Sequence, residues 1–144
     1  MNVTVFGATG AIGQLIVTDL LDASHTVTAH ARNPTKVPAV WADRVRVVVG
    51  EITDATAIDE AVAGADAVIS ALGPSMAREG TGLPLVEGTS LIVKAMHRHG
   101  VSRYVGHATP SVVDPRDRRT AQVRLIGWMG RTFLPRAYAE LTRL

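Results

Sequence analysis

The chain has 144 residues, a length typical of one domain with its own core. Hydrophobic residues make up 47% of it and aromatic residues only 4%, which excludes a disordered chain and favours a core of aliphatic side chains, as in parallel sheets. There is no cysteine, so disulfides, zinc–thiolate sites and a cysteine nucleophile are excluded. No apolar run has the length of a membrane span and no signal peptide is recognisable, so we expect a soluble, cytoplasmic protein.

The charge is distributed unevenly along the chain. Residues 1–115 contain eight Lys or Arg and eleven Asp or Glu, a net charge of −3. Residues 116–144 contain seven Arg and two acidic residues, a net charge of +5. We therefore expect one domain over 1–144, with a basic, partly helical tail over 113–144.

A strand, a glycine-rich turn and a helix are predicted at the N-terminus. Residues 2–6 have the pattern of a buried strand, and Gly7, Gly10 and Gly13 follow at three-residue spacing. Apolar residues then recur at helical spacing: Ile12, Leu15, Ile16 and Leu20. In this context glycines allow a diphosphate to approach the backbone N–H groups of a helix N-terminus, and Thr9 offers a hydroxyl to a phosphate oxygen. The alternative is a strand-to-helix turn with no ligand.

Strands and helices alternate along the rest of the body. Further strands are predicted over 26–31, 44–50, 66–72 and 102–108. Helices are predicted from the N-cap Asp54 to Gly64 and from a loop over 74–82 to Gly100. The second of these is predicted to have Leu85, Thr89, Ile92, Val93 and Met96 on one face. This alternation predicts an α/β fold with a doubly wound parallel sheet of order 3-2-1-4-5, helices on both faces and a ligand at the carboxyl ends of the strands.

The end of the second predicted strand indicates which dinucleotide would bind. NAD sites usually have a carboxylate there, about 20 residues past the glycines, for the ribose 2′-OH. Here the strand ends at Ala31 and is followed by Arg32 and Asn33, with Lys36 nearby. An arginine suits a 2′-phosphate, so we predict NADP(H) in preference to NAD(H). The alternative is an ordinary solvated arginine.

Two other strand ends are predicted to border the cofactor. Glu51 and Ile52 follow the third strand, where an apolar side chain can cover the adenine. Ala71, Leu72 and Gly73 follow the fourth strand, where small residues leave room for the dinucleotide. Both segments also suit ordinary strand ends.

These segments together resemble the atypical short-chain dehydrogenase/reductases. GATGAIG, HARNP, GEITDATAIDEAVAGADAVISALGP and GTSLIVKAMHRHGVSRYV occur in the order and spacing of that group, over about residues 1–112. It is similar to the NmrA-like, biliverdin reductase B-like and isoflavone-reductase-like proteins. The resemblance implies a Rossmann fold that binds NADP(H), with the diphosphate held by Gly7, Thr9, Gly10, Ala11, Ile12 and Gly13. It also implies that Arg32 binds the 2′-phosphate and that residues 71–73 lie on the ribose side.

The chain departs from this group in its catalytic residues and its length. Short-chain dehydrogenases use a Tyr and a Lys four residues later, whereas Tyr104 is followed at that spacing by Ala108 and Tyr138 by Thr142. Proton transfer would then depend on solvent or on weaker candidates, namely Thr109, Ser111 and His107. The group continues for several dozen residues beyond this length, so the chain is either a fragment or a naturally short form. An NADP(H)-dependent oxidoreductase acting on a small carbonyl or conjugated substrate is expected, with a non-catalytic NADP(H) sensor or an inactive truncated relative as alternatives.

The tail and the histidines suggest few other partners. We expect the apolar residues of 113–144 to form a helical lid or a homodimer surface, because its arginines are spread along the segment rather than clustered. No nucleic acid or membrane partner is expected. No metal is expected either, because the five histidines lack carboxylates at ligand spacing.

Overall fold

A computed structural model describes residues 1–74, 83–106 and 120–143 of the chain. The chain forms two compact units, which are described separately below. The first unit comprises Met1–Gly73 and Glu87–His107, and the second comprises Pro74–Val86 and Ala108–Leu144.

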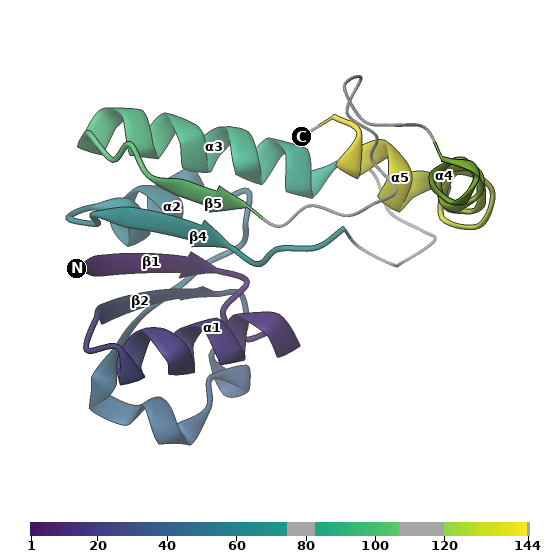
Figure 1. Cartoon of the computed structure of the whole chain (residues 1–144). Helices are drawn as coiled ribbons and strands as arrows, with labels where there is room; N and C mark the ends of the chain where they lie inside the picture. Colours follow the sequence, from purple (N-terminus) through teal and green to yellow (C-terminus); the bar gives the residue numbers. More distant parts are fainter. Residues whose placement is uncertain (75–82, 107–119, 144) are drawn as a thin grey trace. The chain divides into compact units, whose positions relative to one another are not determined.

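The first unit contains a five-stranded parallel sheet of order β3-β2-β1-β4-β5, which confirms the predicted topology (Figure 1). The strands are β1 (Asn2–Phe6), β2 (Thr26–Ala31), β3 (Val45–Val49), β4 (Ala67–Ser70) and β5 (Tyr104–Gly106). β1 and β2 have the predicted bounds, whereas β3 and β4 are shorter than the predicted 44–50 and 66–72 because the residues at their ends lie outside the strand pairing.

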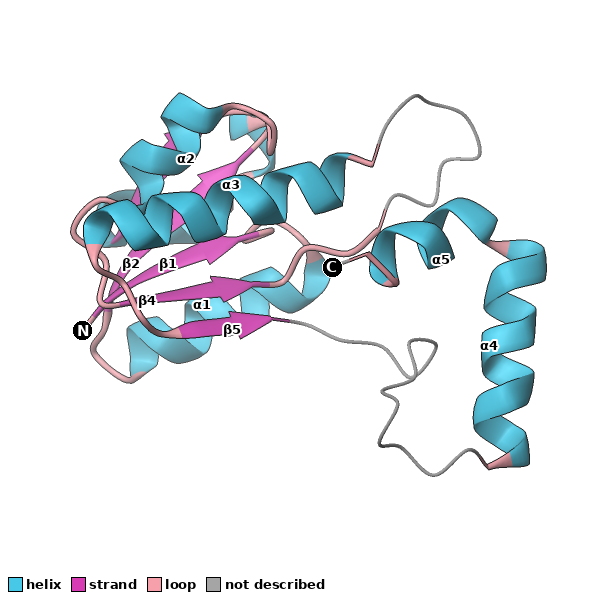
Figure 2. Ribbon diagram, turned by 90° about the horizontal axis from the view of Figure 1, so that it is seen from above, coloured by secondary structure: helices cyan, strands magenta, loops and turns pink. Residues whose placement is uncertain are grey.

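Helices cover both faces of this sheet (Figure 2). They are α1 (Ala11–Asp22), α2 (Ala55–Val62) and α3 (Pro84–His99), with short 3₁₀ turns η1 (Pro34–Lys36) and η2 (Ala39–Arg44). One apolar cluster joins β-strand residues to Val17 of α1 and Trp41 of η2. The other joins Phe6 and Val68 to residues of α2 and α3. The sheet is therefore packed on both sides, as the low aromatic and high aliphatic content predicted.

The packed faces of two helices do not contain every apolar residue that occurs at helical spacing. In α3, Leu85, Ile92 and Met96 are buried, but Val93 is 39% exposed and lies off the packed face. In α1, Ile12 and Leu15 are 50% and 67% exposed. That helix contacts the sheet instead through a face of small and apolar residues, namely Gly13, Ile16, Val17, Leu20 and Leu21. An apolar residue at helical spacing therefore does not always pack against the sheet.

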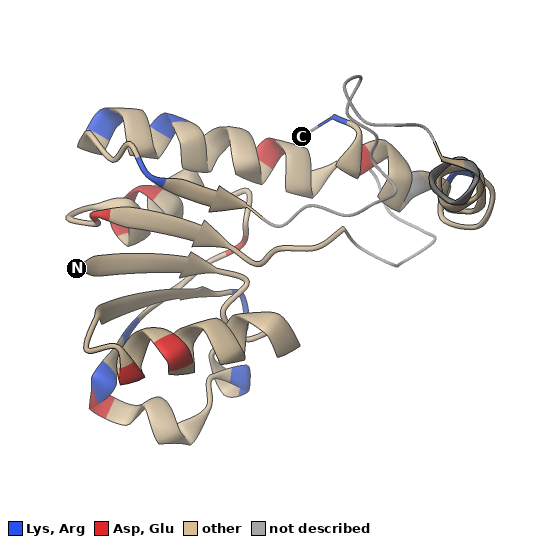
Figure 3. Ribbon diagram, in the orientation of Figure 1, with Lys and Arg blue, Asp and Glu red and all other residues tan. Residues whose placement is uncertain are grey.

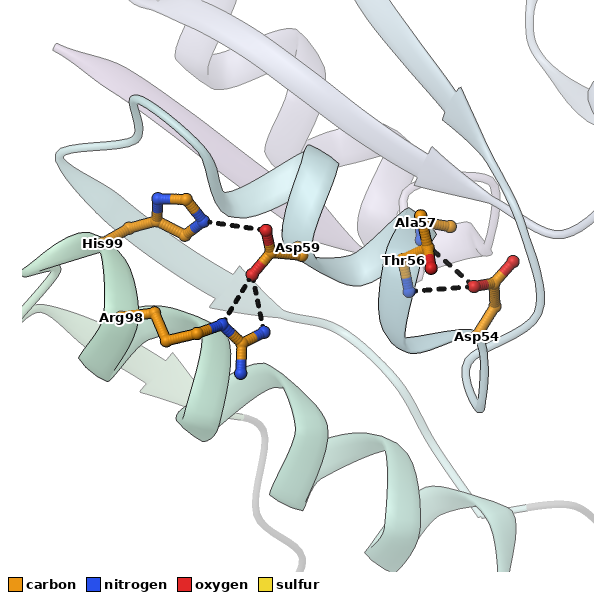
Figure 4. A network of polar contacts seen from close by, with 6 residues as sticks. All are labelled: Asp54, Thr56, Ala57, Asp59, Arg98 and His99. Carbon is orange, nitrogen blue, oxygen red and sulfur yellow. Dashed lines mark hydrogen bonds and ion pairs between the residues drawn. The ribbon is translucent and has the colours of Figure 1, made fainter.

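Polar contacts fix α2 at its start and along its length (Figure 4). Asp54 caps the helix, since its Oδ1 accepts hydrogen bonds from the N–H groups of Thr56 and Ala57 at 2.9 and 3.2 Å. Farther along, Asp59 accepts from Arg98 Nε at 2.8 Å and lies 3.2 Å from His99 Nε2. The hydrogen bonds from Arg98, and then that from His99, lower the pKa of Asp59. These exposed contacts join α2 to the last turn of α3.

The second unit contains the helices α4 (Ala121–Phe133) and α5 (Pro135–Leu141). Glu140 on α5 is fully buried, and its Oε1 accepts a hydrogen bond from the N–H of Leu85 at 3.3 Å. This places a carboxylate at the first turn of α3, where helix N–H groups lack helical acceptors. Several apolar side chains of α4 are instead exposed, namely Leu125, Ile126, Trp128, Met129 and Phe133. The homodimer through this region stays a prediction.

Among the described residues, no helix combines the length and apolar character needed to cross a bilayer.

Candidate nucleotide-binding site

The predicted cofactor residues follow the carboxyl ends of four neighbouring strands. In the parallel registers, Phe6 pairs with both His30 and Ser70, and Ala31 pairs with Val49. The segments that leave β1, β2, β3 and β4 therefore begin at one edge of the sheet. This edge contains the switch point between β1 and β4, where open α/β sheets bind their ligands.

The turn after β1 is closely packed around its glycines. Gly7 has a φ of +74°, and a Cβ at this position would lie 2.9 Å from the carbonyl carbon of Ala71. A Cβ on Gly13 would lie only 2.1 Å from the carbonyl oxygen of Gly7. A glycine is therefore required at position 7, because the backbone has a positive φ and because the end of β4 leaves no room for a Cβ. A glycine is required at position 13 because α1 approaches the turn too closely for a side chain.

The first turn of α1 is open to an anion. Gly10 is the N-cap and provides no side-chain cap, and the first turn contains no acidic residue. Within the described part of the chain, no hydrogen bond engages the N–H groups of Ala11, Ile12 or Gly13. The acidic residues of α1, Asp19 and Asp22, lie in its second half (Figure 3). A diphosphate fits such a helix start, because the free N–H groups and the helix dipole both favour negative charge.

The segment after β2 presents two positive charges. Arg32 and Lys36 are exposed, and neither forms an ion pair with another described residue. Between them, Asn33 caps the turn η1, since its Oδ1 accepts from the N–H and the hydroxyl of Thr35 at 2.9 and 2.8 Å. The Asn33 oxygen thus has a structural role, and the unpaired cations on either side are available to a phosphate.

The segments after β3 and β4 also reach this edge. Glu51 is exposed, whereas Ile52 is half-buried and packs under α3, where a Cβ on Gly88 would lie 2.3 Å from its Cγ1. Residues Ala71 and Leu72 are half-buried beside the glycine turn, and Gly73 is exposed. The predicted residues are thus brought to one sheet edge, although their contacts with a cofactor remain predictions.

A buried histidine lies on the β2–β3 side of this edge. His30 is 4% exposed, its ring centroid lies 5.1 Å from that of Phe6, and its Nε2 has no hydrogen-bond partner. Burial lowers its pKa, and the nearby carboxylates of Asp54 and Glu51 oppose this effect. The side-chain alternation along β2 is the sequence signal for this position, because it places His30 on the same face as the residues of the α2–α3 core.

We expect His30 to make the protein less stable in mild acid. Its folded-state pKa is lowered, so below about pH 6.5 the unfolded chain binds a proton that the folded chain resists. Its contribution is constant above that pH and falls as the pH decreases, by up to about 1.4 kcal/mol per pH unit. In urea unfolding between pH 5 and 7.5, His30→Leu should have a shallower pH dependence than wild type. The exposed-site control His97→Gln should keep the wild-type slope, and equal slopes for all three proteins would contradict this assignment.

The three candidates for proton transfer, Thr109, Ser111 and His107, lie outside the described residues. The described residues also contain no group of three or more His, Asp or Glu side chains arranged to hold a metal ion.

The sheet order and the open helix start at its switch point define a Rossmann-type nucleotide-binding protein. The chain belongs to the NAD(P)H-binding family, whose model matches residues 7–141. It is 36% identical over 122 residues to a 3-beta-hydroxysteroid dehydrogenase from Mycolicibacterium neoaurum, covering 78% of this chain and 33% of that protein. It is 31% identical over 115 residues to 2-alkyl-3-oxoalkanoate reductase from Stenotrophomonas maltophilia, covering 78% of this chain and 34% of that one. The chain therefore spans about a third of the length of these relatives.

Solved structures show the same fold. A short-chain dehydrogenase/reductase from Veillonella parvula, determined in complex with NADP, superimposes with a TM-score of 0.73 at 21% identity. The match covers 99% of this chain and 60% of that structure. The family and the fold confirm the predicted resemblance to NAD(P)-binding, short-chain dehydrogenase/reductase-like proteins, and the two relatives above are named as a dehydrogenase and a reductase.

Proposed function

We propose that this protein is an NADP(H)-dependent oxidoreductase that reduces a small carbonyl or conjugated substrate. The observation that carries the cofactor preference is the β2 end, where the unpaired Arg32 stands in place of a carboxylate. A guanidinium there favours a 2′-phosphate, whereas a carboxylate would repel it. Bound NADPH would supply the hydride, while the chain's own residues would hold the diphosphate at α1 and the 2′-phosphate at Arg32 and Lys36.

The alternative is a protein that binds NADP(H) without turnover. This alternative is supported by the lack of a Tyr–Lys pair in the sequence, since Ala108 and Thr142 stand where a lysine would follow the two tyrosines. A proton for the reduced substrate would then have to come from solvent or from a residue outside that motif.

Titration with NADPH and with NADH tests the proposal directly. We expect NADPH to bind at least about tenfold more tightly than NADH, because one charge-assisted hydrogen bond to the 2′-phosphate lowers the Kd by about this factor. Absorbance at the nicotinamide band should then fall in the presence of a reducible member of a carbonyl panel. Tight NADPH binding without turnover of any carbonyl would favour the sensor, and failure to bind either nucleotide would refute both functions.

A further inference from the structure

The last paired residues of β4 and β5 continue the row of strand ends that begins at the glycine turn. Phe6 pairs with Ser70, and Ser70 pairs with Gly106. The residue after Ser70 contacts the turn, since a Cβ on Gly7 would lie 2.9 Å from the carbonyl carbon of Ala71. Gly106 on β5 is therefore separated from β1 and its turn by one strand, β4, and lies on the side of β1 opposite to β2 and Arg32.

The ring of Tyr104 extends along β5 to this last pair. A Cβ on Gly106 would lie 2.9 Å from Tyr104 Cε1 and 3.4 Å from its hydroxyl oxygen. Tyr104 pairs with Val68, which belongs to the core cluster formed with α2 and α3, so both side chains lie on that face of the sheet. The absence of a side chain at Gly106 thus allows the phenol to reach the carboxyl end of the strand.

Two hydroxyl groups at this position, those of Ser70 and Tyr104, have no partner among the described residues. Neither Ser70 nor Tyr104 forms a side-chain hydrogen bond within residues 1–74, 83–106 and 120–143. Tyr104 is 39% exposed and Ser70 only 6%. His30 Nε2 is the one fully buried unpartnered side-chain atom of the described residues, so the Ser70 hydroxyl keeps some access to solvent. A hydroxyl that has no partner among the described residues and keeps access to solvent is suited to a ligand oxygen.

In doubly wound sheets, the half of the sheet that contains β2 binds the adenine ribose of the dinucleotide. The strands on the other side of β1, here β4 and β5, are left for the nicotinamide half of the dinucleotide. We propose that Tyr104 and Ser70 form a hydroxyl pair on the nicotinamide side, which binds the oxygen of a carbonyl substrate. This inference rests on the proposed function. The phenol and the serine hydroxyl each donate a hydrogen bond to that oxygen and orient the carbonyl carbon.

Chemical footprinting of the tyrosines tests this placement without a known substrate. The chain has only two tyrosines, Tyr104 and Tyr138, so nitration by tetranitromethane can be followed at Tyr104 separately. NADP⁺ should slow nitration of Tyr104 about fivefold or more by covering it. Adenosine 2′,5′-bisphosphate, which lacks the nicotinamide half, should not protect Tyr104.

The outcomes separate this inference from the proposed function. Calorimetry on the same samples reports binding: if neither nucleotide binds, the proposed function fails. If both bind and Tyr104 is nitrated at the same rate in all samples, the hydroxyl pair is refuted alone. Protection by the adenosine bisphosphate would also refute it, because Tyr104 would then lie on the adenine side.

Two variants test the roles of Gly106 and the hydroxyls. Gly106→Ala places a methyl against the Tyr104 ring, so it should abolish protection by NADP⁺ while leaving the Kd for NADP⁺ within about twofold. Binding of acetophenone to the complex with NADP⁺ can be observed by NMR. Tyr104→Phe and Ser70→Ala should each bind acetophenone about threefold to tenfold more weakly than wild type, because each variant loses one hydrogen bond to the carbonyl oxygen. The control Tyr138→Phe should match wild type. Absence of acetophenone binding to the wild-type complex, or equal binding by all variants, would overturn the carbonyl assignment.

Discussion

Gly13→Ala should destabilise the protein by about 3 kcal/mol or more and abolish NADPH binding by the folded fraction. The added Cβ would lie 2.1 Å from the carbonyl oxygen of Gly7 and 2.8 Å from the Cα of Ala8. Both are backbone atoms of the turn, so the clash cannot be relieved by a side-chain rotation. Either α1 moves away from the sheet or the turn is displaced, and each change removes the free N–H groups from the phosphate position. Urea unfolding and NADPH titration measure the two effects.

Gly10→Ala is the matched control at the same turn. Its Cβ would meet only the carbonyl oxygen of Gly7, at 3.3 Å, and the backbone φ of −77° is open to alanine. We expect a stability loss within about 1 kcal/mol, together with weaker NADPH binding because the methyl group faces the open helix start. If Gly13→Ala were as stable as Gly10→Ala, the close approach of α1 to the turn would be wrong.

Arg32→Ala should weaken NADPH binding by about 10- to 150-fold and leave the Kd for NADH nearly unchanged. A guanidinium forms charge-assisted hydrogen bonds with a phosphate. A hydrogen bond of this kind contributes about 1.5–3 kcal/mol when salt does not screen it. Arg32 is exposed, so the titrations should be made at low ionic strength, where the effect is largest. Lys36→Ala should have a smaller effect in the same direction, because an ammonium group makes a less directional contact.

Arg46→Ala provides the control for a general loss of positive charge. Arg46 is exposed like Arg32, but it lies near the start of β3 and forms an ion pair with Glu60 at 2.9 Å. Its removal should leave both affinities as they are in wild type. Equal weakening of NADPH and NADH by Arg32→Ala would show that Arg32 does not bind the 2′-phosphate.

The diphosphate part of the candidate site was largely predictable from local pattern. Gly7, Gly10 and Gly13 follow one strand and open one helix, so their spacing and context are contained in a dozen consecutive residues. Arg32 could be identified in the same way, because the end of β2 is marked by a change from β-branched residues to Asn33 and Pro34. The carboxyl-edge position of residues 51–52 and 71–73 followed from the βαβ rule rather than from any local signal.

Side-chain environment was less predictable. The helical spacing of Ile12 and Leu15 matched a buried face, yet both are exposed because Gly13 brings the adjacent face of α1 against the turn. Val93 fits the apolar pattern of α3 but lies off the packed face. Helical periodicity predicts which residues share a face of a helix, whereas the sheet or turn against which the helix packs decides which of these residues become buried.

The sequence by itself determined the fold class, the strand order, the glycine turn and the absence of a carboxylate after β2, because these depend on residue type and spacing along the chain. Only the tertiary structure showed that His30 has a buried nitrogen without a partner, and that the ring of Tyr104 extends over Gly106 beside Ser70. These features depend on pairing between strands that are distant in the chain, as between Phe6 and His30 or between Ser70 and Gly106, or on the direction of one side chain along its strand. Neither quantity is encoded in a local pattern, because both depend on which strands become neighbours in the sheet.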